Sequence, residues 1–306
     1  MALALKNMNI PFIKYRKLYY FLSFILVSSS IAFLFVFGLK PGIDFTGGSL
    51  IEIQFSQAVP ENAIIENKLA DLDLGQITFQ PIGEKGLLLR LKHIDEETHQ
   101  EILSRIGDAQ EQRFETIGPL VGKELEKKTR TAIILSLLAI IAYIAFAFRK
   151  ISYPIKSWQF GIAALVALFH DIVIPLGVFS LLGKLYGVEM TIPLVAALLT
   201  VLGYSISDTV VVFDRIRENL LKREKKASFD EIVNTSLNQT LVRSASTGLS
   251  VFFTLFAIYF FGGDSLKYFS LILIIGIICG TYSSIFIASP LIVSWVKWKN
   301  RRLTNT

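Results

Sequence analysis

Long apolar segments dominate the pattern of hydrophobic and polar positions along this chain. Blocks of about twenty apolar residues alternate with charged loops, and each block is long enough to cross a hydrocarbon layer roughly 30 Å thick as a helix. We therefore predict an all-α polytopic membrane protein. Its six spanning helices are predicted at Leu18–Leu39, Ala132–Phe148, Trp158–Leu182, Thr191–Phe213, Ser244–Phe261 and Tyr268–Trp295.

The polar insert between the first two spans has a different periodicity. Ile51, Ile53 and Phe55 alternate with polar residues, which is typical of a strand with one buried face. Apolar residues at helical spacing follow Pro60, and a second helix is predicted to begin at Asp95. Further strands are predicted at Ile77–Ile82, Gly86–Lys92 and Arg113–Ile117. The order β-α-β-β-α-β predicts an α+β ferredoxin-like domain inserted between helices 1 and 2.

Lysine and arginine residues predict the orientation of the spans. Loops with many basic residues stay in the cytoplasm, and all such loops of this chain fall on one side. They contain Lys6, Lys14, Arg16, Lys17, Arg149, Lys150, Lys156, Arg215, Arg217, Lys222, Arg223, Lys225, Lys226, Arg243, Lys297, Lys299, Arg301 and Arg302. Both termini are therefore predicted to be cytoplasmic, and the insert extracytoplasmic.

This orientation divides the chain into four parts. They are a cytoplasmic N-terminus with the first span (1–39), the extracytoplasmic α+β domain (40–130), the bundle of spans two to six (131–296) and a basic cytoplasmic tail (297–306). One large outer loop with six spans resembles one half of a transporter built from two related halves.

Composition supports a membrane protein: 52% of residues are hydrophobic and 18% charged, against about 25% charged in soluble domains. The net charge of +6 is uneven, because the insert carries 11 basic and 16 acidic residues and the remainder is strongly basic. The positive charge thus indicates topology, not nucleic-acid binding. Cys279 is the single cysteine, and no nucleotide-binding, hydrolase or metal motif is present. We expect no catalytic residues, cofactor or metal.

Ionisable residues within the spans are the candidates for function, because a charge at membrane depth is costly and usually serves a pathway or a partner. Asp208 of span four and Arg243 at the start of span five are predicted to lie at similar depth. Asp208 would be either a proton-accepting carboxylate tuned by Arg243, or a helix-packing group beside an interfacial anchor. For Asp171, next to His170 in span three, a packing hydrogen bond to a neighbouring serine or threonine is favoured.

Several motifs of this chain resemble those of the SecD and SecF export proteins. One is Asp44-Phe45-Thr46-Gly47-Gly48, directly after span one, and the longest is Gly203–Asn219, which contains Asp208. Three further segments are similar to the same family: Ile117–Gly122, His170-Asp171 and Ser236–Arg243. The sequence departs from the pattern at Ser207, where asparagine is common.

The resemblance implies an accessory subunit of the bacterial Sec preprotein translocase, in the inner membrane and akin to one half of an RND exporter. It implies SecD as partner in a heterodimer, the SecYEG channel and YajC as neighbours, and translocating preproteins as clients. It further implies that the proton motive force drives late steps of translocation, with Asp208 and Arg243 as proton-relay residues and Asp171 as a third member. The alternatives are a proton-coupled exporter of a small solute and a non-conducting scaffold.

Overall fold

The computed structural model describes residues 10–147, 155–222 and 227–304. Part of the orientation prediction rests on Lys6, Arg149, Lys150, Arg223, Lys225 and Lys226, which lie outside these ranges. The chain forms two compact units. The first comprises the described residues up to Leu39, Ile133–Lys184 and the described residues from Pro193 on; the second comprises Lys40–Ala132 and Leu185–Ile192.

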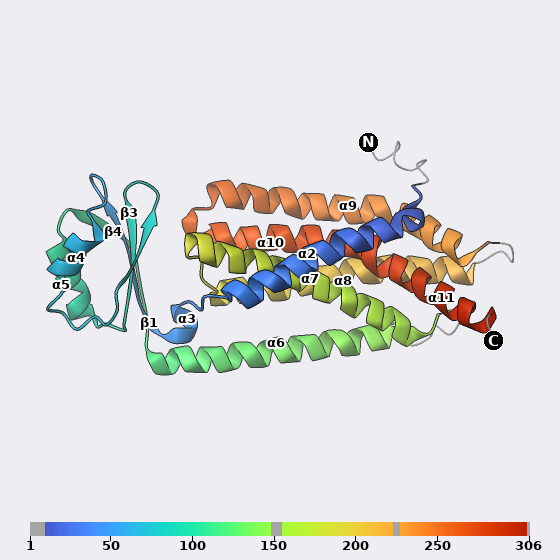
Figure 1. Ribbon diagram of the computed structural model, residues 1–306, viewed down its shortest axis with the longest axis horizontal. Coiled ribbons are helices and arrows are strands. Elements are labelled where there is room, and N and C mark those ends of the chain that lie inside the picture. The colour runs from blue at the N-terminus through green and yellow to red at the C-terminus, as the bar shows by residue number, and fades with distance from the viewer. Residues whose placement is uncertain (1–9, 148–154, 223–226, 305–306) are drawn as a thin grey trace. The chain divides into compact units, whose positions relative to one another are not determined.

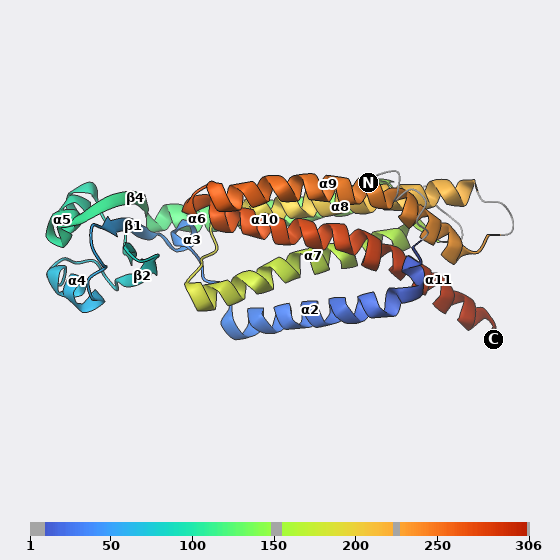
Figure 2. The same cartoon turned by 90° about the horizontal axis from the view of Figure 1, so that it is seen from above.

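The first unit is a bundle of long helices that run side by side (Figures 1 and 2). In the described part of the chain six helical segments are long and apolar enough to cross a membrane, as predicted. The elements are the 3₁₀ turn η1 (Phe12–Tyr15), α2 (Arg16–Phe37), α6 (Pro119–Ala147), α7 (Ser157–Tyr186), α8 (Ile192–Leu221), α9 (Phe229–Phe261), α10 (Asp264–Ser283), the π-helical turn η2 (Ser284–Ala288) and α11 (Ser289–Thr304).

Several helices continue beyond the apolar spans that were predicted to start or end at Ala132, Phe213 and Ser244. Helix α6 begins at Pro119, α8 continues to Leu221, and α9 begins at Phe229. The added turns carry ion pairs at helical spacing, Glu124–Lys128 and Glu218–Lys222, and Ser228 and Glu231 form a capping box at the start of α9. Hydropathy locates only the apolar part of a helix, whereas caps and charge pairs decide where it ends.

The helices of the bundle differ in how much of their surface is buried. In the apolar stretch of each helix, 61% of the residues are buried in α7 and 67% in α10–α11. Only 11% are buried in the stretch that contains α2, and 6% in that of α6. The rings of Phe160 and Phe213 meet edge to face at 5.0 Å in the core. The interior of this unit is thus built mainly by α7, α8 and α10–α11.

Small residues, among them Gly276 and Gly280, allow α8 and α10 to approach closely. A Cβ atom at position 276 would lie 2.7 Å from Cγ1 of Val201, and one at position 280 would lie 3.1 Å from Cβ of Ser205. Tyr204 and Thr281 add a hydrogen bond between their hydroxyls at 2.9 Å. This close packing places polar side chains of the two helices within reach of one another.

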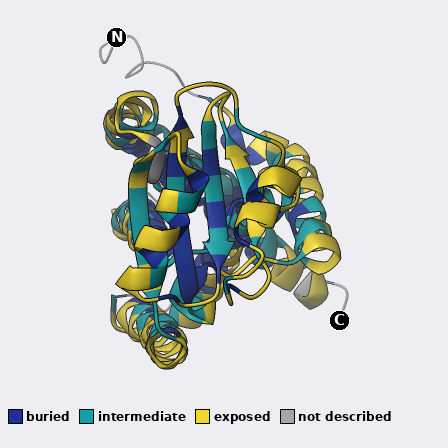
Figure 3. Cartoon of the chain, turned by 90° about the vertical axis from the view of Figure 1, so that its left-hand side faces the viewer, coloured by how far each residue is buried: buried dark blue, intermediate teal, exposed yellow. Residues whose placement is uncertain are grey.

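The second unit contains a four-stranded antiparallel sheet of order β2-β3-β1-β4. Figure 3 shows its largely buried central strands behind helices α4 and α5, which cover one face. The core includes Ile51, Ile53, Leu87, Leu89 and Ile102, so the predicted alternation is confirmed. The elements are α3 (Ile43–Thr46), β1 (Gly48–Phe55), α4 (Asn62–Lys68), β2 (Thr78–Ile82), β3 (Gly86–Leu91), α5 (Glu96–Ile106) and β4 (Ala109–Ile117).

The last strand and the second helix show what the pattern predicted correctly and incorrectly. Strand β4 begins at Ala109, four residues before the predicted Arg113, because Phe55 at the end of β1 pairs with Ala109. Asp95 caps α5 as predicted: its side chain accepts a hydrogen bond from the amide of Thr98 at 2.9 Å. The side-chain and backbone hydrogen bonds of Thr98 hold the pKa of Asp95 below its usual value.

Candidate functional site

Asp208 of α8 joins neighbouring helices through its carboxylate. Oδ1 accepts a hydrogen bond from Ser244 Oγ of α9 at 2.6 Å, and Oδ2 accepts one from Ser284 Oγ of η2. Asp208 is only half-buried, whereas Ser244 and Ser284 are buried. A carboxylate that accepts bonds from two hydroxyl groups is stabilised in its charged form, and proton uptake would weaken both bonds.

Arg243 directly precedes Ser244, so α9 brings its positive charge to the level of Asp208. The arginine interacts electrostatically with that carboxylate, but in the described residues no ion pair joins the two side chains. Arg243 is exposed on the surface of the bundle. An exposed arginine near a half-buried carboxylate is available to respond when the charge of that carboxylate changes.

Asp171 of α7 lies deeper and is fully buried. Its Oδ2 accepts hydrogen bonds from Ser205 Oγ of α8 at 2.5 Å and from Ser283 Oγ of α10 at 2.6 Å. His170 Nδ1 lies 2.8 Å from Oδ1, while the buried His170 Nε2 has no hydrogen-bond partner among the described residues. The interhelical serine bonds are of the kind predicted for a packing role. Ser283, which binds Asp171, is adjacent in sequence to Ser284, which binds Asp208.

The serines that hold these carboxylates are the functional candidates that the sequence interpretation missed. Ser205 and Asp208 are three residues apart on α8 and therefore share a face. Ser283 and Ser284 are adjacent, followed six residues later by Pro290. Serines are common in membrane helices, so only the pairing of serine positions with acidic residues on other helices could have pointed to them.

One face of α8 and α9 is polar although both helices read as membrane spans. Its exposed residues are Gly203, Ser207, Arg243, Ser246 and Thr247. A hydrocarbon environment does not solvate an arginine or free hydroxyl groups. This face therefore requires a polar neighbour or water.

The residues after the first span, Asp44 to Gly48, form a short hydrogen-bonded connection that leads into β1, which is called a structural joint below. Asp44 Oδ2 accepts a hydrogen bond from the amide of Ile192, the first residue of α8, at 2.8 Å, which satisfies an unpaired helix N-terminal donor. Thr46 Oγ1 donates to the carbonyl of Gly42 at 3.1 Å, and Phe45 is half-buried.

Both glycines of this joint are required by the backbone. Gly47 and Gly48 have positive φ angles of 71° and 124°, a region that side chains disfavour. A Cβ atom would lie 2.9 Å from Cα of Pro119 at position 47, and 2.8 Å from the carbonyl oxygen of Leu91 at position 48. The motif is thus explained by chain geometry within the second unit.

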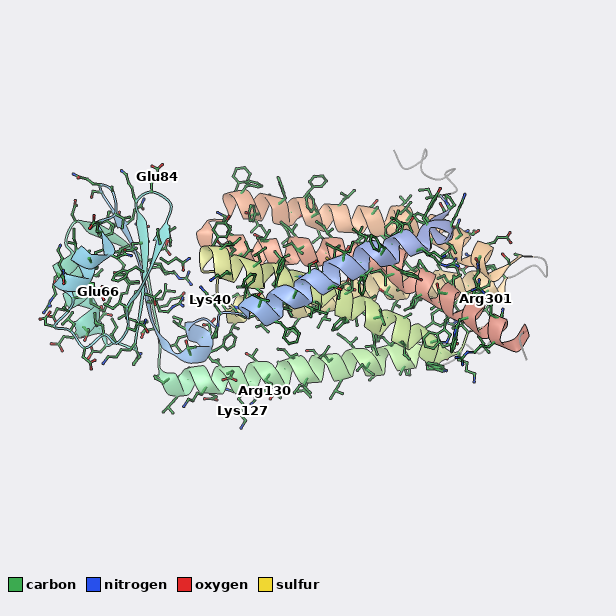
Figure 4. The ribbon with its side chains drawn as sticks, viewed as in Figure 1. Lys40, Glu66, Glu84, Lys127, Arg130 and Arg301 are labelled. Atoms are coloured by element: carbon green, nitrogen blue, oxygen red, sulfur yellow. The ribbon has the colours of Figure 1, made fainter. Side chains whose placement is uncertain are left out.

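A cavity of about 600 Å³ lies in the second unit, lined by Gln80, Arg90 and Tyr186 among others. Arg90 forms an ion pair with Glu189, and Gln80 Nε2 donates to the carbonyl of Tyr186 at 2.8 Å. Burial lowers the pKa of Arg90. These bonds tie the 185–192 loop to β2 and β3. Charged side chains such as Glu66 and Glu84 lie on the surface of this unit (Figure 4), and the described residues contain no cluster suited to a metal ion.

Comparison with known proteins assigns both parts of the chain to one family. Residues 98–298 match the family model "Protein export membrane protein SecD/SecF, C-terminal", and residues 32–59 match the "SecD/SecF GG Motif". Protein translocase subunit SecF from Thermobaculum terrenum is 44% identical over 302 residues, which cover 94% of each chain. The SecF subunit from Desulfurispirillum indicum is 41% identical, covering 96% of this chain and 94% of the relative.

Solved structures support the same assignment. The crystal structure of SecDF, a translocon-associated membrane protein from Thermus thermophilus, superposes with a TM-score of 0.81 at 32% identity over 95% of this chain. SecDF in a super-membrane-facing form gives a TM-score of 0.65 at 34% identity over 96% of this chain. The present chain spans 39% of the length of each of these SecDF chains.

Fold and site together define a multi-pass membrane protein. It has ionisable groups inside its helical bundle and a small antiparallel sheet in a separate compact unit. Its relatives act in protein transport across membranes. The chain belongs to the SecF family of protein translocase subunits, within the wider SecD/SecF family.

Proposed function

We propose that this protein is an accessory subunit of the Sec translocase that uses the proton motive force to promote late steps of preprotein translocation. The observation that carries the proposal is the setting of Asp208, a carboxylate in a spanning helix held by serines of two other helical elements beside an exposed arginine. One charge crossing 100 mV of membrane potential releases about 2.3 kcal/mol. That energy is of the order of the hydrogen bonds that Asp208 loses on protonation.

SecD is the proposed partner, in a heterodimer. This chain corresponds to 39% of the SecDF polypeptide, and the exposed polar face of α8 and α9 requires a polar neighbour. A proton path along that face would involve Asp208 and Arg243, with Asp171 as a deeper member. The SecYEG channel, YajC and translocating preproteins complete the proposed set of partners.

The proposed setting is the bacterial inner membrane, with both termini in the cytoplasm. Asp230 at the start of α9 pairs with Arg16 before the first span and with Lys297 after the last. This supports placing both described ends on one side, and Arg301 lies near the C-terminal end of α11 (Figure 4). The basic residues there favour the cytoplasm. We assign the helices to an RND-like half and, from the strand order β2-β3-β1-β4, the insert to the ferredoxin-like class.

The test is completion of export in inverted membrane vesicles. A labelled preprotein is arrested part-way, ATP is removed, and a proton gradient is imposed. Asp208→Asn preserves size but removes the titrating charge, so gradient-driven completion is expected to stop while the complex still assembles. Glu126→Gln, the same change at an exposed position of α6, is the matched control and is expected to export normally.

Two other outcomes separate the rival functions. Normal export by both Asp208→Asn and an Arg243→Gln variant would reduce the protein to a scaffold. Proton flux that depends on a small solute and needs no preprotein would instead indicate a solute exporter.

A further inference from the structure

Two consecutive serines, one at the end of α10 and one at the start of η2, bond to the buried carboxylate of Asp171 and the half-buried carboxylate of Asp208. Ser283 Oγ donates to Asp171 Oδ2 at 2.6 Å, and Ser284 Oγ donates to Asp208 Oδ2. Two neighbouring residues therefore bond to two different helices, α7 and α8. Ser283 and Ser284 are fully buried, so water does not reach their hydroxyl groups.

The backbone at this attachment departs from α-helical geometry. Residues 284–288 form the π-helical turn η2 between α10 and α11. Pro290 lacks an amide hydrogen, and its ring crowds the carbonyl one turn earlier, which explains why the helix widens here. Ser289 Oγ donates to the carbonyl of Ser284 at 2.8 Å, which adds a side-chain bond across the widened turn. A π-turn that is already open can repack without unfolding a regular helix.

Ser284 has two alternative acceptors for its single hydroxyl proton. One is the Asp208 carboxylate, and the other is the carbonyl oxygen of Thr281, one turn back in its own helix, at 3.2 Å. A bond to an ionised carboxylate is roughly twice as strong as one to a neutral acceptor. When Asp208 takes up a proton, its carboxyl group is no longer a stronger acceptor than the carbonyl of Thr281. The hydroxyl of Ser284 can then donate to that carbonyl instead.

We propose that Ser283 and Ser284 are positioning residues that attach the π-turn to both carboxylates, so that proton uptake at Asp208 releases η2 from α8 while Asp171 retains α10. The proposal rests on the proton-driven function above and deepens it, because it names the element that converts the charge of Asp208 into a change of helix packing. Ser284 makes the switched contact, and Ser283 the permanent one.

Other ionisable groups near the two carboxylates contribute to the electrostatic potential at Asp208. Asp171 and Arg243 interact electrostatically with Asp208, and Tyr204 and Cys279 lie within electrostatic reach of one of the two carboxylates. His170 contacts Asp171, and its ring stacks on Tyr282 at 5.8 Å between centroids. None of these groups bonds to Ser284 in the described structure, so a change at Ser284 isolates the switched contact from them.

The experiment compares substitutions in the complete complex with SecD, reconstituted in vesicles. Ser284→Ala removes the switched bond, Ser284→Thr keeps the hydroxyl, and Ser270→Ala is the matched control. Ser270 is a fully buried serine of the same helix whose hydroxyl bonds to the carbonyls of Leu266 and Lys267. Gradient-driven export is measured across pH, and infrared difference spectra record the C=O band of protonated Asp208, identified by its absence in Asp208→Asn.

We expect Ser284→Ala to lower gradient-driven export about tenfold or more, the factor associated with loss of a charge-assisted hydrogen bond. The pH midpoint and the Asp208 band should shift in this variant and remain unchanged in Ser270→Ala. Ser284→Thr should restore export to within about threefold. In an Asp208→Asn background, Ser284→Ala should cause no further loss, because the switched contact is already uncharged.

The outcomes distinguish this proposal from the function on which it rests. Normal export and an unshifted band in Ser284→Ala, together with a defective Asp208→Asn, would overturn the role of Ser284 and leave the proton-driven function intact. Normal export by Asp208→Asn would overturn both. If Ser284→Ala does not accumulate in the membrane, Ser284→Cys replaces it, since a thiol of similar size is only a weak donor, and the same loss and shift are expected.

Discussion

The contact between Gly276 and Val201 is where the packing of α8 against α10 can be tested most directly. Val201 is fully buried, and a Cβ atom at position 276 would lie 2.7 Å from its Cγ1 and 3.0 Å from its Cβ. The branched side chain of valine is stiff in a helix, so it cannot turn away. Gly276→Ala should therefore push α8, which carries Asp208, away from α10, which leads directly into the turn η2 that carries Ser284.

The expected loss follows from opposing terms. Overpacking of a buried site costs about 1–3 kcal/mol, and replacing a helical glycine by alanine returns up to about 1 kcal/mol. We therefore expect Gly276→Ala to destabilise the protein by roughly 1–2 kcal/mol. Val201→Ala alone should cost about 2 kcal/mol through its cavity. The double variant should lie within about 1 kcal/mol of the native protein, because the new methyl group occupies the space that valine leaves.

The measurement is reversible unfolding of the full chain in detergent, with the four proteins of the double-mutant cycle compared side by side. Gly203→Ala is the control, because in the described part of the chain no atom outside the local helix backbone lies within 4 Å of a Cβ at that position and the helix gains propensity. Additive losses, with no recovery in the double variant, would refute the close-packing argument. Equal behaviour of Gly276→Ala and Gly203→Ala would refute it as well.

Three further outcomes are expected. Asp171→Leu should lower stability by about 2–4 kcal/mol in the same unfolding assay, because the hydroxyls of Ser205 and Ser283 lose their acceptor. Asp171→Asn retains an acceptor and should lose less stability. Equal losses in the two variants would argue against this cause. Gly48→Ala should expose β1 amides to hydrogen exchange, since φ is 124° there, whereas protection at the native level would contradict the strain. The pKa of Asp95 is lowered on folding, so its contribution to stability is present above the unfolded pKa near 3.9 and is lost as pH falls through the folded pKa. Amide exchange in α5 should therefore increase at that low pH in the native protein. Asp95→Asn should show no such step.

Much of the fold was predictable from local patterns. Apolar runs predicted the six spans, and alternation at Ile51 and Ile53 predicted the buried face of β1. The helix cap at Asp95 was also visible, because capping depends on residues close in sequence. The ends of α6, α8 and α9 were not, since those turns are polar and their stability comes from ion pairs and caps.

The candidate site divides in the same way. Asp208, Arg243 and Asp171 stood out in the sequence, because a charge within an apolar run is conspicuous whatever surrounds it. Their hydrogen-bond partners did not, because Ser244 is 36 positions from Asp208 and Ser283 is 112 positions from Asp171. A serine carries no sign in the sequence of which helix will lie opposite it.

The amino-acid sequence by itself determined the membrane class, the number of spans, the strands and helices of the insert, and the acidic residues inside the bundle. These follow from hydrophobicity and short-range spacing, which act along the chain. Only the tertiary structure decided that Ser283 and Ser284 hold two carboxylates at one π-turn. That arrangement depends on how closely α10 approaches α7 and α8, and helix approach is set by side-chain packing between segments far apart in sequence.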